Sequence, residues 1–225
     1  MDLRQLFNSP NAIARYYSRF RVAERLLLTG HSHQAWPDVS LDAQQQAWLD
    51  AAELVDEKWT RAADVAEDVR NGWRRLLGEA DAQVALGENT HELVTRMLSA
   101  LPLRQRPRLV TTDGEFHTIR RQLDRLAEEG IDVVKVAARP ASTLAERLIR
   151  AIDERTACAL VSSVLYETAE IVPNLAGVAA RCVEVGAQCL VDAYHHLNVV
   201  PFDIRAMGLE PAFVTGGGYK YCQLG

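Results

Sequence analysis

The residues that could do chemistry gather in two short segments near the carboxyl end of this 225-residue chain. Asp192-Ala193-Tyr194-His195 follows the apolar run 188–191, and Gly216-Gly217-Gly218-Tyr219-Lys220 follows the run 213–215. Each apolar run predicts a short strand. A lysine amine can form a Schiff base with an aldehyde, and a buried carboxylate can hold a pyridine nitrogen protonated. A carboxylate and a lysine after successive strands therefore indicate an enzyme that uses pyridoxal phosphate, with Asp192 and Lys220 as its catalytic residues.

Lysine is rare in this chain, which sharpens the interpretation of Lys220. Of the 25 lysine and arginine residues, only Lys58, Lys135 and Lys220 are lysines. Lys58 lies in a charged helical stretch and Lys135 interrupts an apolar run, whereas Lys220 follows glycines that permit a close backbone approach to a ligand. Lysine loses its proton readily when it is desolvated, and arginine does not. The alternative is a solvated loop lysine, the usual state of this residue type.

Composition and charge exclude several classes of function. The formal net charge is −5 and no basic stripe is present, so nucleic acid and anionic membranes are poor candidates as partners. No apolar run approaches the length of a membrane span, and the N-terminal segment MDLRQLFNSPNA lacks the apolar region of a signal peptide. The four cysteines show no C-x-x-C spacing and read as reduced, packed thiols. We therefore expect a cytoplasmic protein.

Strand-like and helical stretches alternate through most of the chain. We expect an N-terminal arm with helices over residues 1–77, with Gly78 as a helix stop, and one cofactor-binding domain over residues 78–225. The strand-like runs are 84–86, 108–112, 131–136, 157–164, 189–191 and 213–215. The helical stretches are 6–20, 41–77, 91–101, 144–152, 174–185 and one that begins near Phe116. This alternation predicts an α/β fold, a mostly parallel sheet sandwiched by helices, in which ligands bind beyond the carboxyl ends of the strands.

Residues that follow other strands supply further candidates. Asn89 and Thr90 join a strand to a helix, where a phosphate would meet backbone N–H groups and the positive end of the helix dipole. A simple N-cap explains both residues equally well. Phe116 follows the next strand and can stack on a planar cofactor ring, or pack on the sheet as an ordinary hydrophobic residue.

Three more side chains are candidates for contacts with the cofactor. His195 can reach its phenolate oxygen or its phosphate, and Tyr219 can donate its hydroxyl to the phosphate. Ser163, or Ser162 before it, can add a donor at a strand end, although a serine there can equally be a satisfied strand-end hydroxyl. Asp192 could instead cap the turn that follows it.

A metal site is the rival hypothesis from the residues alone. His31, His33, His195 and His196 could join Asp192 as ligands, since a His-x-His segment can present two ligands on one side. Nothing in the sequence brings the two histidine clusters together, and such a site leaves the glycine-rich loop and its lysine without a role. We therefore predict no metal. A phosphate-binding P-loop fits worse, since no serine or threonine follows the lysine.

With these residues in place, the chain resembles the kynureninase group of the class V aminotransferase-like, fold-type I pyridoxal phosphate enzymes, from about Leu26 to the end. The resemblance rests on an Asp-x-x-His motif, on a Tyr-Lys-Tyr motif, and on an asparagine that opens a helix before them. In this sequence these are Asp192 and His195 followed by Val199, Pro201 and Asp203, then Tyr219-Lys220-Tyr221, with Asn174 upstream.

The resemblance implies a role for each matching residue. Lys220 resembles the Schiff-base lysine, and Asp192 resembles the partner of the pyridinium nitrogen. The other matching positions are His195 and Tyr219 as cofactor contacts, Phe116 as the ring-stacking aromatic, Asn89 and Thr90 in the phosphate loop, and Ser163 as a further contact. The resemblance also implies a homodimer and the large domain of this fold, with a small C-terminal domain that we expect to be missing from these 225 residues.

Departures from that group fall on the substrate side. The chain reads Phe116-His117-Thr118-Ile119 where the group shows Phe-Pro-Ser/Thr-Asp, so an expected acid is absent. It reads Gly30-His31-Ser32-His33 in place of Gly-Asn-Ser-Leu, and Cys222-Gln223-Leu224 in place of Leu-Asn-Ala/Gly. This pattern favours a relative with an altered substrate or reaction.

We expect an enzyme that acts on an amino acid, either by kynureninase-like hydrolytic Cβ–Cγ cleavage or as a relative with an altered substrate. His31, His33 and Trp36 are the candidates for contacts with that substrate. The alternatives are a class V aminotransferase or a lyase, and a non-catalytic relative that keeps pyridoxal phosphate as a structural or regulatory ligand.

Overall fold

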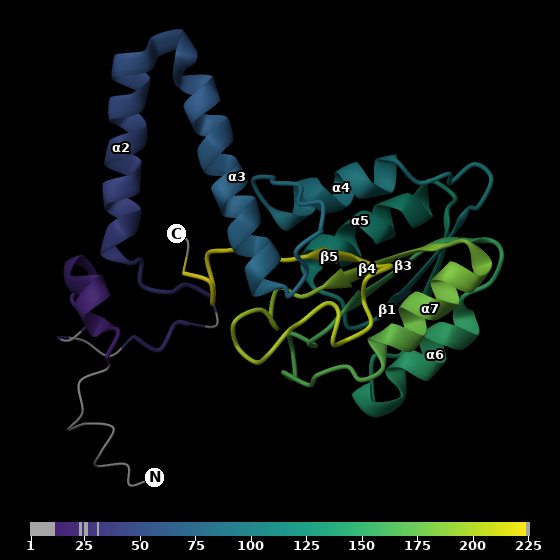
Figure 1. The fold of residues 1–225 in the computed structure, drawn as a ribbon. Coiled ribbons are helices and arrows are strands. Elements are labelled where there is room, and N and C mark those ends of the chain that lie inside the picture. Colours follow the sequence, from purple (N-terminus) through teal and green to yellow (C-terminus); the bar gives the residue numbers. More distant parts are fainter. Residues whose placement is uncertain (1–11, 23, 25–26, 31, 224–225) are drawn as a thin grey trace, which may run out of the picture. The chain divides into compact units, whose positions relative to one another are not determined.

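The computed structural model describes residues 12–22, 24, 27–30 and 32–223 of the chain (Figure 1). These residues form two compact units. One contains the chain up to Val69 together with the segment from Gly218, and the other runs from Arg70 to Gly217. The division falls inside a helix, α3 (Lys58–Leu76), and the domain boundary expected after residue 77 stays a prediction.

The first unit is built on two long helices. It contains η1 (Ala14–Phe20), α2 (Asp38–Leu54), η2 (Val55–Glu57) and the amino-terminal part of α3. The Asp38 carboxylate accepts the backbone N–H groups of Ser18 and Arg19, at 3.0 and 2.9 Å, and the Ser18 hydroxyl at 2.6 Å. These bonds, and the Ser18 hydroxyl above all, lower the pKa of Asp38. They connect the start of α2 to η1.

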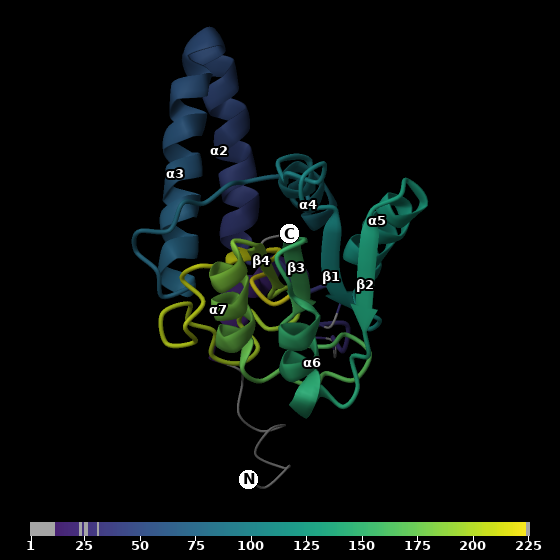
Figure 2. The same cartoon turned by 90° about the vertical axis from the view of Figure 1, so that its right-hand side faces the viewer.

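The helical pattern expected over residues 41–77 is divided in two. Val55 has a φ of 48°, a conformation that a β-branched residue rarely adopts, and the chain turns there between α2 and α3 (Figures 1 and 2). Arg61 and Asp50 form an ion pair of 3.5 Å between the two helices. Gly78 follows the end of α3 with a φ of +67°, so the predicted helix stop is confirmed.

The second unit, as described, is a five-stranded parallel sheet between two layers of helices (Figures 1 and 2). The strands, in the spatial order β2-β1-β3-β4-β5, are β1 (Arg108–Thr112), β2 (Asp132–Val136), β3 (Thr156–Ser162), β4 (Gln188–Asp192) and β5 (Phe213–Thr215). The helices are α4 (Thr90–Ser99) and α5 (His117–Glu128) on one face, with η3 (Ala141–Thr143), α6 (Leu144–Ala151) and α7 (Leu175–Val185) on the other. The α/β fold predicted from the sequence is confirmed.

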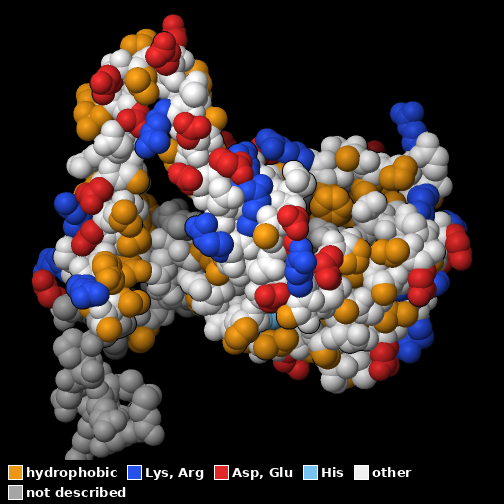
Figure 3. Space-filling view, in the orientation of Figure 1, with side chains coloured by type: hydrophobic (Ala, Val, Ile, Leu, Met, Phe, Trp, Pro, Cys, Tyr) orange, Lys and Arg blue, Asp and Glu red, His pale blue; other side chains and the backbone are white. Residues whose placement is uncertain are grey.

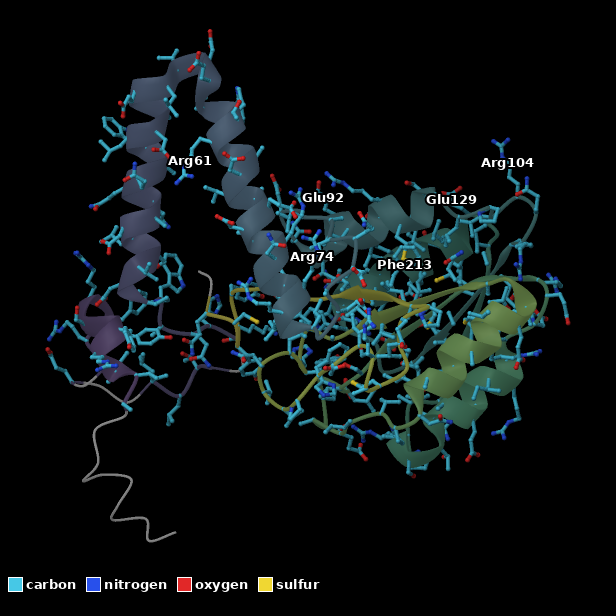
Figure 4. All side chains as sticks on the ribbon, in the orientation of Figure 1. Arg61, Arg74, Glu92, Arg104, Glu129 and Phe213 are labelled. Carbon is cyan, nitrogen blue, oxygen red and sulfur yellow. The ribbon has the colours of Figure 1, made fainter. Side chains whose placement is uncertain are left out.

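The apolar or polar character of each strand's residues explains its place in the sheet. All seven residues of β3 are buried, and its sequence TACALVS carries no charge. A strand covered by helices on both faces needs apolar side chains on both sides, so it reads as a continuous apolar run. The edge strand β5 has three residues, and Phe213 at its start is exposed (Figure 4). The apolar β3 therefore occupies the centre of the sheet.

The strand expected over residues 84–86 is not formed, and that prediction is wrong. Arg70 Nε donates to the Val84 carbonyl at 3.1 Å. Arg74, which is labelled in Figure 4, donates from Nε to the Ala82 carbonyl at 2.9 Å. Guanidinium groups of α3 thus bind backbone carbonyls of residues 82 and 84. In a strand, these carbonyls would instead have accepted hydrogen bonds from a neighbouring strand. An irregular segment enters α4 instead.

One buried cluster of the second unit lies where α4 and α5 pack on the sheet. It contains Val94, Leu98, Leu109, Ile119, Leu123, Ala157, Cys158, Leu160 and Leu190. At the amino ends of the strands, Arg108 pairs with Asp132 at 2.8 Å and with Asp153 at 2.5 Å. One guanidinium therefore connects the amino ends of β1 and β2 to the turn before β3.

We expect Leu160→Ala to lower the free energy of unfolding by about 2–5 kcal/mol, because it leaves a cavity at a fully buried position in the central strand. Val183→Ala, on a 58% exposed side chain of α7, is the control and should change that free energy by less than about 0.5 kcal/mol. Urea unfolding of both variants measures the difference. Equal effects would contradict the place of β3 in the core.

Candidate active site

The carboxyl ends of three neighbouring strands place three polar side chains in a row. Ser162 ends β3, Asp192 ends β4 and Thr215 ends β5, and the parallel register pairs Asp192 with the other two. Asp192 is 5% exposed, and its Oδ1 accepts the backbone N–H of Tyr194 at 2.8 Å. This bond caps the turn after β4, one of the two roles that the sequence allows for Asp192. The predicted buried carboxylate at a strand end is confirmed.

Asn89 is the N-cap of α4. Its Oδ1 accepts the backbone N–H of Glu92 at 2.9 Å, and the Glu92 carboxylate accepts the backbone N–H of Glu88 at 2.8 Å (Figure 4). The simple capping role is therefore present. A contact between Asn89 and a phosphate stays a prediction.

The hydroxyl groups of Thr90 and Thr215 are buried and have no hydrogen-bond partner within the described part of the chain. Buried hydroxyls are nearly always paired, and an unpaired one costs on the order of 1–3 kcal/mol. Thr90 lies at the positive end of the α4 dipole, and Thr215 is next to Asp192 in the register. Both hydroxyls are donors that a phosphate or another polar ligand would satisfy, so this donor set fits the predicted cofactor.

Aromatic rings gather beyond the ends of β1, β3 and β4. The Phe116 ring lies 5.2 Å from that of Tyr166 and 5.7 Å from that of His195, both edge-on, and 5.0 Å from that of His117. The structure therefore brings the predicted Phe116 and His195 together, in a group of rings against which a planar ligand could stack. Sequence reasoning misses Tyr166. This residue follows the apolar run 157–164 much as Phe116 follows the run 108–112.

Ser163 and His196 form a buried network behind Asp192. The Ser163 hydroxyl donates to the Asp192 carbonyl at 3.2 Å and lies 3.3 Å from His196 Nδ1, while His196 Nε2 lies 3.2 Å from the Pro201 carbonyl. A neutral imidazole with its proton on Nε2 satisfies that carbonyl. Ser163 is thus the satisfied strand-end hydroxyl that the sequence left as an alternative, and its contact with a cofactor stays a prediction.

Two of the glycines before Lys220 pack closely against other side chains. A Cβ on Gly217 would lie 2.1 Å from Cε2 of Tyr194, and one on Gly216 would lie 2.4 Å from Cδ1 of Leu197. A side chain at either position would force Tyr194 or Leu197 to move. The two glycines thus lie against the segment after β4, and their approach to a ligand stays a prediction.

The remaining predicted residues belong to the first unit or fall outside the described chain. Lys220 is 7% exposed, and Tyr219 lies beside His33 with ring centroids 5.7 Å apart. Trp36 packs against the Phe20 ring at 5.9 Å. His31 lies outside the described residues. The roles of these side chains stay predictions.

Glu115 is a buried acid that sequence reasoning also misses. It ends the polar segment Thr112-Asp113-Gly114-Glu115, which reads as an exposed turn, yet it is 2% exposed. Desolvation by burial raises its pKa to about 7.

Metal ligands, cavities, membrane-spanning helices and surface charge are the other features that could indicate a function. Among the described residues, no three His, Cys, Asp or Glu side chains converge as metal ligands. A cavity of about 760 Å³ between α4, α5 and the loop 101–105 is lined by none of the predicted site residues. No helix in the described ranges is both long and apolar enough to cross a membrane. The visible face of the second unit carries interspersed acidic and basic side chains (Figure 3).

Comparisons with known proteins give one curated relative and many solved structures. No family model matches the sequence. The probable cysteine desulfurase of Methanothermobacter thermautotrophicus is 25% identical over 174 residues, which are 72% of this chain and 43% of the relative.

The similar structures are those of cysteine desulfurases and a cystine C–S lyase. A C-DES mutant with glycine covalently linked to its PLP cofactor has a TM-score of 0.77 and 16% identity, over 95% of this chain and 56% of that one. C-DES with cysteine persulfide has a TM-score of 0.75 and 18% identity, over 89% and 55%. The apo cysteine desulfurase of Thermococcus onnurineus NA1 has a TM-score of 0.76 and 15% identity, over 95% and 54%.

These likenesses establish the fold, a parallel sheet flanked by helices as in fold-type I enzymes. The chain spans about half the length of the proteins it matches. The names of these proteins do not support the resemblance to kynureninases in particular.

Protonation of His196 should lower the free energy of unfolding at acidic pH. Burial lowers its pKa below 6.5, so the folded protein binds that proton less readily than the unfolded chain does, and stability falls as the pH drops below about 6.5. His196→Gln cannot take up the proton. We therefore expect its unfolding free energy to fall less than that of the wild type between about pH 7.5 and pH 5.5. Urea titrations at both pH values measure this, with the exposed His91→Gln as control; an unchanged pH dependence in His196→Gln would refute the assignment.

Proposed function

We propose that this chain forms the cofactor-binding part of a pyridoxal phosphate-dependent enzyme that acts on an amino acid. The observation that carries the proposal is Asp192, a carboxylate buried at the carboxyl end of β4, between the ends of β3 and β5, in a fold-type I sheet. Pyridoxal phosphate, when bound, supplies an aldehyde that condenses with amines and a pyridine ring that accepts electrons.

Asp192 is the group that would hold the proton on the pyridine nitrogen. A buried carboxylate stays ionised when a cation lies next to it, since the two charges compensate each other's loss of water. The Tyr194 N–H fixes Oδ1 of Asp192 and thereby the direction of the carboxylate. Phe116, with His195 beside it, would bind the face of the ring and exclude water.

The phosphate would bind at the start of α4. Thr90 offers a buried, unpaired hydroxyl there among the described residues, and Thr215 offers another at the end of β5. The positive end of the helix dipole favours an anion at this place. Asn89 would act mainly through the helix that it caps.

For Lys220 the support comes from the sequence. It is one of three lysines, it follows a glycine-rich loop after β5, and it is buried. A desolvated lysine amine loses its proton readily and becomes a nucleophile toward an aldehyde. Tyr219 would contact the phosphate, and His31, His33 and Trp36 would contact the substrate.

The substrate class that the comparisons favour is a sulfur-containing amino acid. The relative and the similar structures are named as cysteine desulfurases and a cystine C–S lyase, so cysteine and cystine are the first substrates to test. Kynureninase-like Cβ–Cγ hydrolysis, transamination and cofactor binding without turnover are the other outcomes to separate. A homodimer is part of the proposal.

Lys220→Ala should abolish covalent attachment of the cofactor. Borohydride reduction of the protein with pyridoxal phosphate, followed by peptide mass mapping, is expected to find the label on the peptide that contains Lys220. Lys58→Ala and Lys135→Ala are matched controls, since they are the other two lysines of the chain and should leave labelling unchanged. Label on either of those lysines, with Lys220 unmodified, would overturn the proposal.

Product analysis should identify the reaction. We expect the purified protein with pyridoxal phosphate to release sulfide or a persulfide from cysteine or cystine, because the proteins that share its fold are named for that chemistry. Anthranilate and alanine from kynurenine would instead indicate the hydrolase, and a keto acid would indicate transamination. Bound cofactor without turnover of any amino acid would contradict the enzymatic part of the proposal.

A further inference from the structure

Glu115 is a buried acid whose carboxyl group binds two strands at their carboxyl ends. Its Oε1 accepts the Thr112 hydroxyl at 2.7 Å and the Ser162 backbone N–H at 3.2 Å. Its Oε2 accepts the Ser162 hydroxyl at 2.6 Å. Thr112 ends β1 and Ser162 ends β3, so one side chain connects the two strand ends.

The same strand end lies beside Asp192. Ser162 is the register partner of Asp192, and the next residue, Ser163, donates its backbone N–H to the Asp192 carbonyl at 2.8 Å. Any shift of Ser162 therefore reaches the residue that ends β4. The hydrogen bonds link Glu115 to the backbone of Asp192 through Ser162 and Ser163, and both carboxyl groups are buried.

Opposing effects set the pKa of Glu115. Burial raises its pKa, the bonds from Ser162 and Thr112 lower it, and the negative charge of Asp192 raises it again, with a result of about 7. Thr112 from β1 and Ser162 from β3 face it as uncharged donors, and Asp192 from β4 is the charged group that acts on it. The charge of Asp192 is the smallest of these effects.

We propose that Glu115 is a positioning residue for Asp192: it holds Ser162, and with it the end of β3, beside Asp192, and its proton changes the ionisation of Asp192. That Asp192 serves a cofactor rests on the proposed function. The coupling between the two carboxyl groups does not.

The first test uses the protein without cofactor. With ¹³C at the glutamate side-chain carboxyl, an NMR titration should show one glutamate with a midpoint near pH 7, the value of about 7 expected for Glu115. That transition should vanish in Glu115→Gln and persist in Glu154→Gln, which removes the same charge from an exposed loop. A glutamate transition near 7 that survives Glu115→Gln would overturn the proposal.

Two further variants should move that midpoint in opposite directions. Asp192→Asn removes a negative charge, so the midpoint should fall by some tenths of a pH unit or more. Ser162→Ala removes a donor to the ionised carboxylate, so the midpoint should rise. A purely structural role predicts no such pair of opposite shifts. An unmoved midpoint in folded Asp192→Asn would refute the coupling to Asp192. An unmoved midpoint in folded Ser162→Ala would refute the hydrogen bond through which Glu115 holds the end of β3.

The cofactor enters only in the last measurement. In protein loaded with pyridoxal phosphate, Glu115→Gln should shift the pH dependence of the cofactor's absorption spectrum, and Glu154→Gln should not. Unchanged pH dependence in Glu115→Gln would refute the action of Glu115 through Asp192. If the wild type binds no pyridoxal phosphate, the proposed function fails, while the opposite midpoint shifts still decide the coupling.

Discussion

The parallel register of β3, β4 and β5 is the constraint on which the candidate site depends. Parallel strands end at one edge of a sheet, so Ser162, Asp192 and Thr215 become neighbours without any direct sequence relation. A slip of β4 by one residue would turn each of its side chains to the other face of the sheet. Asp192 would then leave its place between Ser162 and Thr215. The apolar residues 189–191 of β4 lie between the exposed Gln188 and the buried Asp192, so a slip would move one of these polar ends into the apolar part of the strand.

Burial changes the acid–base chemistry of these side chains, and it also costs free energy of desolvation. A carboxylate that leaves water is destabilised unless hydrogen bonds or an opposite charge compensate it. At Glu115 three hydrogen bonds are not enough, and burial still raises the pKa to about 7. Asp192 is buried one strand further on, at the place that we propose for the ring nitrogen. A protonated ring nitrogen would add an opposite charge there, and the cofactor would offer partners to the hydroxyls of Thr90 and Thr215, which have none among the described residues.

The local sequence pattern predicts a helix or strand correctly where the residues of that element alone determine it. The run 108–112 and the run 213–215 become strands with the expected bounds, because turn residues flank an apolar core in each. The run 84–86 has the same local pattern and fails, because arginines of α3 bind carbonyls in and before it. Asp192 was predictable from the apolar strand before it. Glu115 was not, because only the fold shows that its polar turn is buried between β1 and β3.

The same distinction explains why the sequence indicated the cofactor more firmly than the reaction. In their proposed roles, Asp192 for the ring nitrogen and Lys220 for the aldehyde would be needed whatever bond the enzyme breaks, so they carry no information about the substrate. The bond that breaks is selected by groups on the substrate side, and there the chain departs from the kynureninase pattern at residues 30–33, 116–119 and 222–224. Names of cysteine desulfurases and a C–S lyase among the similar proteins agree with that departure. Under the proposed function, the mismatched segments therefore bear on the reaction, whereas the matching acid and lysine do not.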